Sequence, residues 1–297
     1  MLVRLHPNRS SIRSTTAALG LAALLAIGGT ADAAPGTPAD LYSLAQKYLL
    51  GEGVPRDAQK CFELAQKAAE QGHPEAWATL GYCYSVGFGA KQDDAEARRC
   101  FSLAAEKGSI IGKGNLGLFI IRGRGGEKDA PRGVALMQEA ARAGNQQSAI
   151  LLGEIFYIGE HANGVPDYQA AHAILLGPAE AGNATAQNTI GVLLKDGRIG
   201  EKDELGARIW LERSAMQGNA KAGFNIGEML WKQQARDSWT RIEALRWLTV
   251  ADRLNETMAY YFIEDIKAGL DPQELRTARE LAQVTLSALP AAASKHR

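Results

Sequence analysis

The sequence predicts an all-α protein, an α-solenoid of about six stacked antiparallel helix hairpins followed by a C-terminal capping helix. Three kinds of residue recur along the chain with a shared spacing of 36 residues and a single step of 38. An apolar residue precedes glycine at Leu80-Gly81, Leu116-Gly117, Leu152-Gly153, Ile190-Gly191 and Ile226-Gly227. Aspartate recurs at Asp57, Asp93, Asp129, Asp167 and Asp203, and a second glycine at Gly72, Gly108, Gly144, Gly182 and Gly218. Repeats of this length are typical of stacked units, because one unit alone cannot bury its apolar face.

Residues 76–111 show how each unit is expected to fold. Apolar and small residues at helical spacing predict two short helices. They are Ala76, Leu80, Gly81 and Tyr84 in the first helix, and Ala97, Phe101, Ala104 and Ala105 in the second. Gly87 and Gly89 are expected to end the first helix, because glycine accepts the left-handed backbone found there. Asp93 is expected to cap the second helix, and Gly108 to end it, so the unit is a helical hairpin.

This pattern closely resembles the Sel-one-like repeat (SLR), a longer-looped relative of the tetratricopeptide repeat. The second unit matches the family pattern at Leu80, Gly81, Tyr84, Gly87, Gly89, Asp93, Ala97, Phe101, Ala104, Ala105 and Gly108. The resemblance covers roughly residues 40–255 and implies a right-handed α-solenoid. It says little about function, because the matching positions hold the scaffold together.

The expected organisation follows the repeats. The segments are a signal peptide at 1–33, a short linker at 34–39, repeats at about 40–75, 76–111, 112–147, 148–185, 186–221 and 222–255, capping helices at 256–289, and a disordered tail at 290–297. Asp271, Pro272 and Glu274 predict the start of the last helix, with an N-cap, a proline in the first turn and a capping-box acid.

The N-terminal segment has the features of a secretory signal peptide. Three arginines precede an apolar run at residues 17–29, and Ala31-Asp32-Ala33 forms a small-x-small cleavage site. A retained membrane anchor is the alternative, but the apolar run is short for a span. We therefore expect cleavage near Ala33, a periplasmic or secreted protein, and no membrane span after cleavage.

Little in the sequence indicates chemistry. Lys and Arg number 33 against 33 Asp and Glu, so no basic excess favours nucleic acid. No two histidines stand at zinc-ligand spacing. Each Gly-x-Gly belongs to a repeat loop and not to a strand-helix turn, so nucleotide binding lacks its structural context. We expect no enzyme activity, metal or cofactor.

Cys61, Cys83 and Cys100 would remain after cleavage. One interpretation is that all three are buried free thiols, which behave as small hydrophobic residues. The alternative is a Cys61–Cys83 bridge between neighbouring hairpins, which an oxidising compartment permits.

The first helices of the hairpins are expected to line a concave groove. Counting from each marker glycine, positions −3, +1 and +4 should face it. The candidate partner-binding residues are Tyr42, Tyr82, Arg122, Tyr157, Lys195, Phe224 and Trp231, with Tyr157 and Trp231 as preferred anchors. Aromatic and arginine side chains often anchor partners. The alternative is that some of these residues belong to the core between repeats.

These observations predict a non-enzymatic scaffold that binds a protein or peptide partner in the periplasm. The family resemblance implies adaptors in envelope signalling or exopolysaccharide production. It also leaves open cell-wall (peptidoglycan or β-lactam) binding or weak hydrolase activity, and a purely architectural role in an envelope complex.

Overall fold

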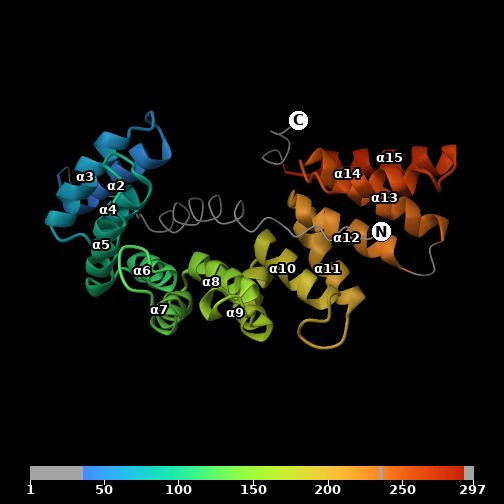
Figure 1. The fold of residues 1–297 in the computed structure, drawn as a ribbon. Coiled ribbons are helices and arrows are strands. Elements are labelled where there is room, and N and C mark those ends of the chain that lie inside the picture. Colours follow the sequence, from blue (N-terminus) through green and yellow to red (C-terminus); the bar gives the residue numbers. More distant parts are fainter. Residues whose placement is uncertain (1–35, 234–236, 291–297) are drawn as a thin grey trace. The chain divides into compact units, whose positions relative to one another are not determined.

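The computed structural model describes residues 36–233 and 237–290, and all of their regular secondary structure is helical (Figure 1). These parts contain fourteen α-helices and one 3-10 turn, with no strand among them. The expected all-α fold of helix hairpins is therefore confirmed. The chain divides into two compact units, Met1–Pro166 and Asp167–Arg297, which we call unit 1 and unit 2.

Unit 1 contains three regular hairpins and a fourth first helix. Its helices are α2 (Pro38–Leu50), α3 (Ala58–Glu70), α4 (Pro74–Val86), α5 (Asp94–Glu106), α6 (Ile110–Arg122), α7 (Ala130–Arg142), α8 (Gln146–Ile158) and the 3-10 turn η1 (Glu160–Ala162). Each helix packs on the next along the chain, and α4 also contacts α6 directly.

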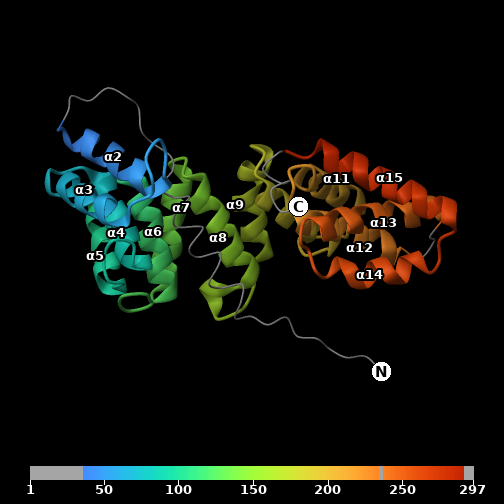
Figure 2. The ribbon, with the colours of Figure 1, turned by 90° about the horizontal axis from the view of Figure 1, so that it is seen from above.

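Unit 2 contains two hairpins between a single helix and a helical cap. Its helices are α9 (Tyr168–Glu180), α10 (Ala184–Lys195), α11 (Glu204–Ala215), α12 (Ala220–Lys232), α13 (Ser238–Arg253), α14 (Ala259–Lys267) and α15 (Pro272–Ala288). Both α14 and α15 pack on α13, and Figures 1 and 2 show them beside it.

The repeated aspartates are helix N-caps, as predicted. Their carboxylates accept hydrogen bonds of 2.8–3.1 Å from backbone N–H groups in the first turns of the second helices. The capping residues are Asp57, Asp93, Asp129, Asp167 and Asp203. The predicted capping box of the last helix is also present, with Asp271 and Glu274 satisfying each other's backbone N–H groups. Each cap stabilises its helix by about 1 kcal/mol.

The chain becomes helical earlier than the sequence suggested. Helix α2 begins at Pro38, within the segment 34–39 that we expected to be a linker. Thr37 caps this helix and forms a capping box with Asp40, and Pro38 has the backbone angle that a first turn requires. The predicted signal peptide and all but the first residue of the predicted tail lie outside the described residues.

The marker glycines allow the two helices of a hairpin to approach closely. A Cβ at Gly117 would lie 2.6 Å from the backbone oxygen of Gly133 in α7. A Cβ at Gly81 would collide with the ring of Phe101, and one at Gly227 with Leu248. These positions are therefore fixed by packing, which explains why the sequence shows them at regular intervals.

Arg124 links the loops of successive hairpins in unit 1. Its guanidinium donates to both carboxylate oxygens of Asp94, at 2.9 and 2.6 Å, and to the backbone oxygen of Ser85 at 3.0 Å. The same group lies over the Phe119 ring, 4.3 Å from its centroid. Bidentate arginine contacts are directional, so this residue fixes the register between the two hairpins.

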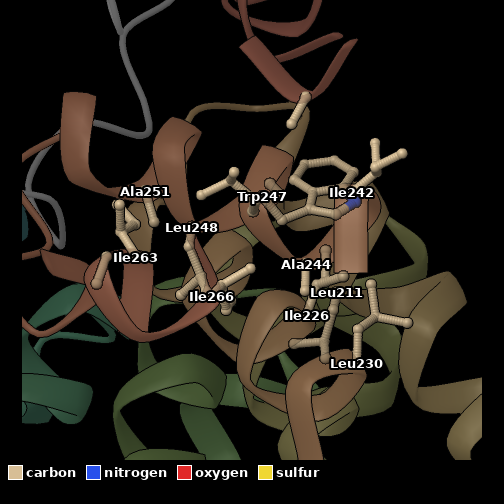
Figure 3. Packing of buried hydrophobic residues seen from close by; sticks show 14 of the residues in the cluster. Leu211, Ile226, Leu230, Ile242, Ala244, Trp247, Leu248, Ala251, Ile263 and Ile266 are labelled. Carbon is tan, nitrogen blue, oxygen red and sulfur yellow. The ribbon is translucent and has the colours of Figure 1, made fainter. Parts of the chain in front are cut away.

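The hydrophobic core of unit 2 runs through all of its hairpins into the cap (Figure 3). Trp247 and Leu248 of α13 lie at its centre, with Ile226 from α12 and Ile266 from α14. Burying a side chain of this size contributes about 1.5–3 kcal/mol, so α14 is a packed part of the unit.

No helix within the described residues is long and apolar enough to cross a membrane.

Candidate functional site

Unit 2 presents a row of half-buried side chains along its first helices. We call this row the unit-2 face. It consists of Asn188, Val192 and Lys195 on α10, Asn225, Phe224, Glu228 and Trp231 on α12, and Phe262 on α14. On α10 the residues are spaced at helical intervals, so they share one side of the helix. Helices α10 and α12 contact each other directly, which brings their two rows together.

Two polar contacts join α10 and α12 across this face. Lys195 Nζ lies 2.7 Å from Glu228 Oε2, and their side chains are 14% and 17% exposed. Asn225 Nδ2 donates a hydrogen bond of 3.0 Å to Asn188 Oδ1. The face therefore offers both charge and amide groups, held in fixed positions by these contacts.

Glu228 stays ionised because two lysines surround it. Burial raises the pKa of its carboxyl, but hydrogen bonds from Lys195 and Lys232 outweigh burial and hold the pKa below its usual value. Lys232 is the exposed partner, with 64% of its side chain accessible. This face thus carries a carboxylate held by two lysines, one of which is exposed to solvent.

The aromatic residues of the unit-2 face stand on the core below them. Phe224 and Phe262 meet edge to face, with ring centroids 5.5 Å apart, and both pack against the core cluster. Trp231 and Val192 also pack against this cluster while remaining partly exposed. Of the predicted candidates, Lys195, Phe224 and Trp231 thus lie together on one surface.

The prediction is wrong for two tyrosines of unit 1. Tyr42 is 5% exposed and Tyr82 is 6% exposed, so neither lines an open groove. The Tyr42 ring stacks on His73, with centroids 4.4 Å apart. Burial raises the pKa of both phenols. These residues form part of the core between hairpins, which was the alternative interpretation.

Arg122 is engaged within unit 1. Its guanidinium makes two hydrogen bonds of 2.8 and 3.1 Å with the carboxylate of Glu160 in η1. Their side chains are 22% and 20% exposed, so the pair is partly screened from water. Next to it, His161 meets the Phe156 ring edge to face at 4.9 Å. Arg122 thus holds the long loop after α8. Tyr157, in the last turn of α8, is half-buried.

A series of amide contacts between first helices was not predicted from the sequence. Gln46 Nε2 donates to Thr79 Oγ1 at 2.9 Å in unit 1, as Asn225 does to Asn188 in unit 2. Asn115 occupies the repeat position of Asn225 but is fully buried, and neither of its amide atoms has a hydrogen-bond partner. The available signal was a polar residue close to the marker position: Asn188 three residues before it, Thr79 and Asn225 two before it, and Gln46 one after it.

The three cysteines are buried with free thiols: Cys61, Cys83 and Cys100. Among the described residues, no group of three or more His, Cys, Asp or Glu side chains could hold a metal ion.

Comparison with known proteins identifies the repeat. The family model of the Sel1 repeat matches residues 38–73, 78–109, 114–145 and 184–219. The crystal structure of a Sel1 repeat protein from Oxalobacter formigenes is similar to this structure, with a TM-score of 0.62, 27% identity, and coverage of 78% of this chain and 66% of that one.

Curated proteins from other organisms are also similar to this chain in sequence. Chitin synthase regulatory factor 3 of Schizosaccharomyces pombe is 28% identical over 200 residues, which is 63% of this chain and 21% of that protein. The Sel1-repeat-containing protein YjcO of Escherichia coli is 28% identical over 172 residues, 54% of this chain and 72% of YjcO. The chain spans about a fifth to a third of the length of the first curated relatives that it matches. The repeat spacing, the capped hairpins and these matches agree: the chain carries four Sel1 repeats.

Proposed function

We propose that this protein is a scaffold that binds a segment of a partner protein on the unit-2 face. The observation that carries the proposal is the combination of half-buried aromatic rings and a fixed ion pair on consecutive first helices. Aromatic anchors beside oriented charges are common in protein interfaces, because they bury much area without losing much side-chain entropy.

The relatives support a role that acts through other proteins. Two of them are named as regulators of chitin synthase, one from Schizosaccharomyces pombe and one from Saccharomyces cerevisiae. Sel1 repeats form helical scaffolds, and this chain has the same repeat. We propose that the partner takes part in envelope signalling or exopolysaccharide production.

Site-directed photo-crosslinking in intact cells tests the binding surface. A photoreactive residue in place of Val192 on the unit-2 face is expected to give a discrete adduct that mass spectrometry identifies. The matched control is Leu205 on α11, which is 72% exposed and lies outside the face. The same adduct at equal yield from both positions would contradict the assignment.

Point variants then measure the contribution of the face. Trp231→Ala and Lys195→Ala are each expected to weaken the identified partner at least tenfold, roughly 1.4 kcal/mol, with unchanged helicity. Leu205→Ala is the control and should bind as the parent protein does. Parent-like affinity in both face variants would overturn the proposal.

The predicted signal peptide bears on the compartment in which the protein acts. We propose that the N-terminal segment directs export and is removed near Ala33, which places the repeats in the periplasm. N-terminal sequencing of the protein from a periplasmic fraction is expected to begin close to Ala34. Full-length protein confined to the cytoplasm would exclude this location.

A further inference from the structure

Unit 1 gathers three thiols in its first two hairpins. Cys61 lies on α3, Cys83 on α4 and Cys100 on α5, and all three are 0–1% exposed. Helix α4 packs against both α3 and α5, so Cys83 lies on the middle helix of the three.

The antiparallel pairing of α3 and α4 places Cys61 opposite Cys83. The turn between these helices is centred on Gly72, and each cysteine lies eleven residues from it. The Cys61 side chain is also the first cause of the raised pKa of the Cys83 thiol, which agrees with their neighbouring positions. The facing stripes consist of small, buried residues, namely Cys61, Ala65 and Ala68 on α3, and Ala76, Thr79 and Cys83 on α4. Small side chains let two helices approach closely, which a disulfide between them requires.

We propose that Cys61 and Cys83 form a disulfide when the chain folds under oxidising conditions, joining the first hairpin of unit 1 to the second. The two thiols lose two protons and two electrons, and an Sγ–Sγ bond forms. The electrons pass to a disulfide oxidant, such as oxidised glutathione or a thiol oxidoreductase, which is released as two thiols.

The folded protein resists this reaction once its thiols are packed. Only a thiolate attacks a disulfide. The contact with Cys61, together with burial, raises the pKa of the Cys83 thiol, and burial raises the pKa of Cys100 to about 11. The bridge therefore forms during folding, or when the terminal hairpin opens, which end units of repeat proteins do most readily.

The position of Cys100 provides an internal control. It belongs to the core cluster that contains Leu80, and its effect on the pKa of the Cys83 thiol is smaller than that of Cys61. Of the three possible pairs, we therefore expect only Cys61–Cys83 to form, and Cys100 to stay reduced.

Refolding the full chain tests the pairing. The reduced protein is unfolded in urea, refolded with a mixture of reduced and oxidised glutathione, and alkylated without reduction. One free thiol per chain and a linked peptide that joins Cys61 to Cys83 are expected. Dithiothreitol should then lower the melting temperature by about 5–10 °C. Three free thiols, or a linked peptide that contains Cys100, would overturn the proposal.

Variants separate the bridge from a packing effect. Cys100→Ser should still form the bridge and have no free thiol. Cys61→Ala should fold, because alanine occupies the same repeat position at Ala97 and Ala171, but its melting temperature should not respond to dithiothreitol. A response as large as that of the parent protein would refute the pairing.

A kinetic measurement tests whether packing protects the thiols in the folded protein. Added to the folded, reduced protein, the same glutathione mixture is expected to form the bridge at least tenfold more slowly than during refolding. Equal rates would show that packing does not protect the thiols.

Discussion

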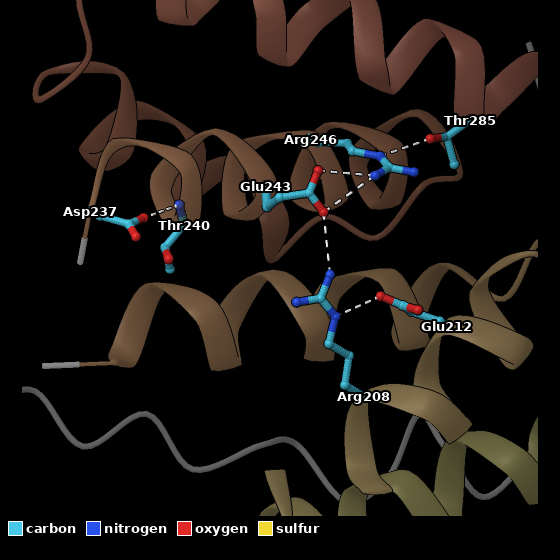
Figure 4. A network of polar contacts seen from close by, with 7 residues as sticks. All are labelled: Arg208, Glu212, Asp237, Thr240, Glu243, Arg246 and Thr285. Atoms are coloured by element: carbon cyan, nitrogen blue, oxygen red, sulfur yellow. Dashed lines mark hydrogen bonds and ion pairs between the residues drawn. The ribbon is translucent and has the colours of Figure 1, made fainter. Parts of the chain in front are cut away.

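The ion pairs of Glu243 in unit 2 predict that substitutions of its two arginine partners lower stability by different amounts (Figure 4). Its side chain is 5% exposed and lies between two arginines. Arg246 contacts it at 3.0 and 3.3 Å and also donates to Thr285 of α15 at 2.9 Å. Arg208 of α11 approaches it at 3.5 Å, with 40% of its own side chain exposed, and has a closer partner in Glu212 at 2.7 Å. The three residues thus connect α11, α13 and the cap.

The two arginines should contribute unequally to stability. Arg246→Met leaves a buried carboxylate with one distant partner, and breaking a buried pair in this way costs about 3 kcal/mol. Arg208→Met removes a partly exposed group and should cost less than about 1 kcal/mol. Glu243→Gln keeps a hydrogen-bond acceptor without the charge, so about 1–2 kcal/mol is expected.

Tryptophan fluorescence during thermal and urea unfolding measures this order, because four of the five tryptophans lie in unit 2. The loss for Arg246→Met corresponds to a melting temperature lower by about 10 °C. In 1 M salt the effect of Arg208→Met should vanish, whereas that of Arg246→Met should persist, since buried pairs are screened less. Equal losses for the two arginine variants would refute the reasoning.

Three further predictions follow from packing and burial. Gly117→Ala should destabilise unit 1 by about 2 kcal/mol, because its Cβ would lie 2.6 Å from a backbone oxygen. Gly177→Ala in α9 is the control: nothing lies within 4 Å of its Cβ, so the free energy of unfolding from the same urea titration should rise by about 1 kcal/mol. Asn115→Leu should raise the free energy of unfolding by about 1 kcal/mol, since both amide atoms are buried without partners, whereas Asn225→Leu removes a hydrogen bond and should not. Burial lowers the pKa of His73, so the unfolded chain binds more protons once the pH falls below about 6.5, and stability is lost from there downward. His73→Gln should remove most of the difference in urea midpoint between pH 7.5 and pH 5.5.

The sequence was sufficient for the hairpins, because each of their determinants acts locally or across one hairpin. Asp129 caps α7 from its own sequence position, and Gly117 is required by the backbone of the neighbouring helix. Such constraints recur in every unit, so they appear in the sequence as a period. Helix α2 is a first helix, and its cap Thr37 stands at the repeat position of His73 and Ser109, which cap later first helices. Its start at Pro38 therefore follows the same period, which the expected linker at 34–39 overlooked.

The candidate surface was only partly predictable, because exposure depends on what the neighbouring first helix presents. A helix rotation of one position exchanges a groove residue for a core residue, and the period cannot fix that rotation. Tyr82 and Lys195 were both assigned to the groove, yet the first is buried and the second is half-buried in an ion pair. The partner of Lys195, Glu228, lies 33 residues away in the sequence, and no motif marks it.

The same repeat position is buried in unit 1 and half-exposed in unit 2. Three residues before the marker glycine, unit 1 has Tyr42, Ala78, Gly114 and Ile150, and all four are buried. At that position unit 2 has Asn188 and Phe224, which remain half-exposed. Small or packed side chains seal the first helices of unit 1 against each other, whereas larger or polar ones leave those of unit 2 accessible. Variants of the half-exposed residues on the unit-2 face are therefore expected to weaken partner binding without lowering stability, whereas variants at the buried repeat position of unit 1 should lower stability.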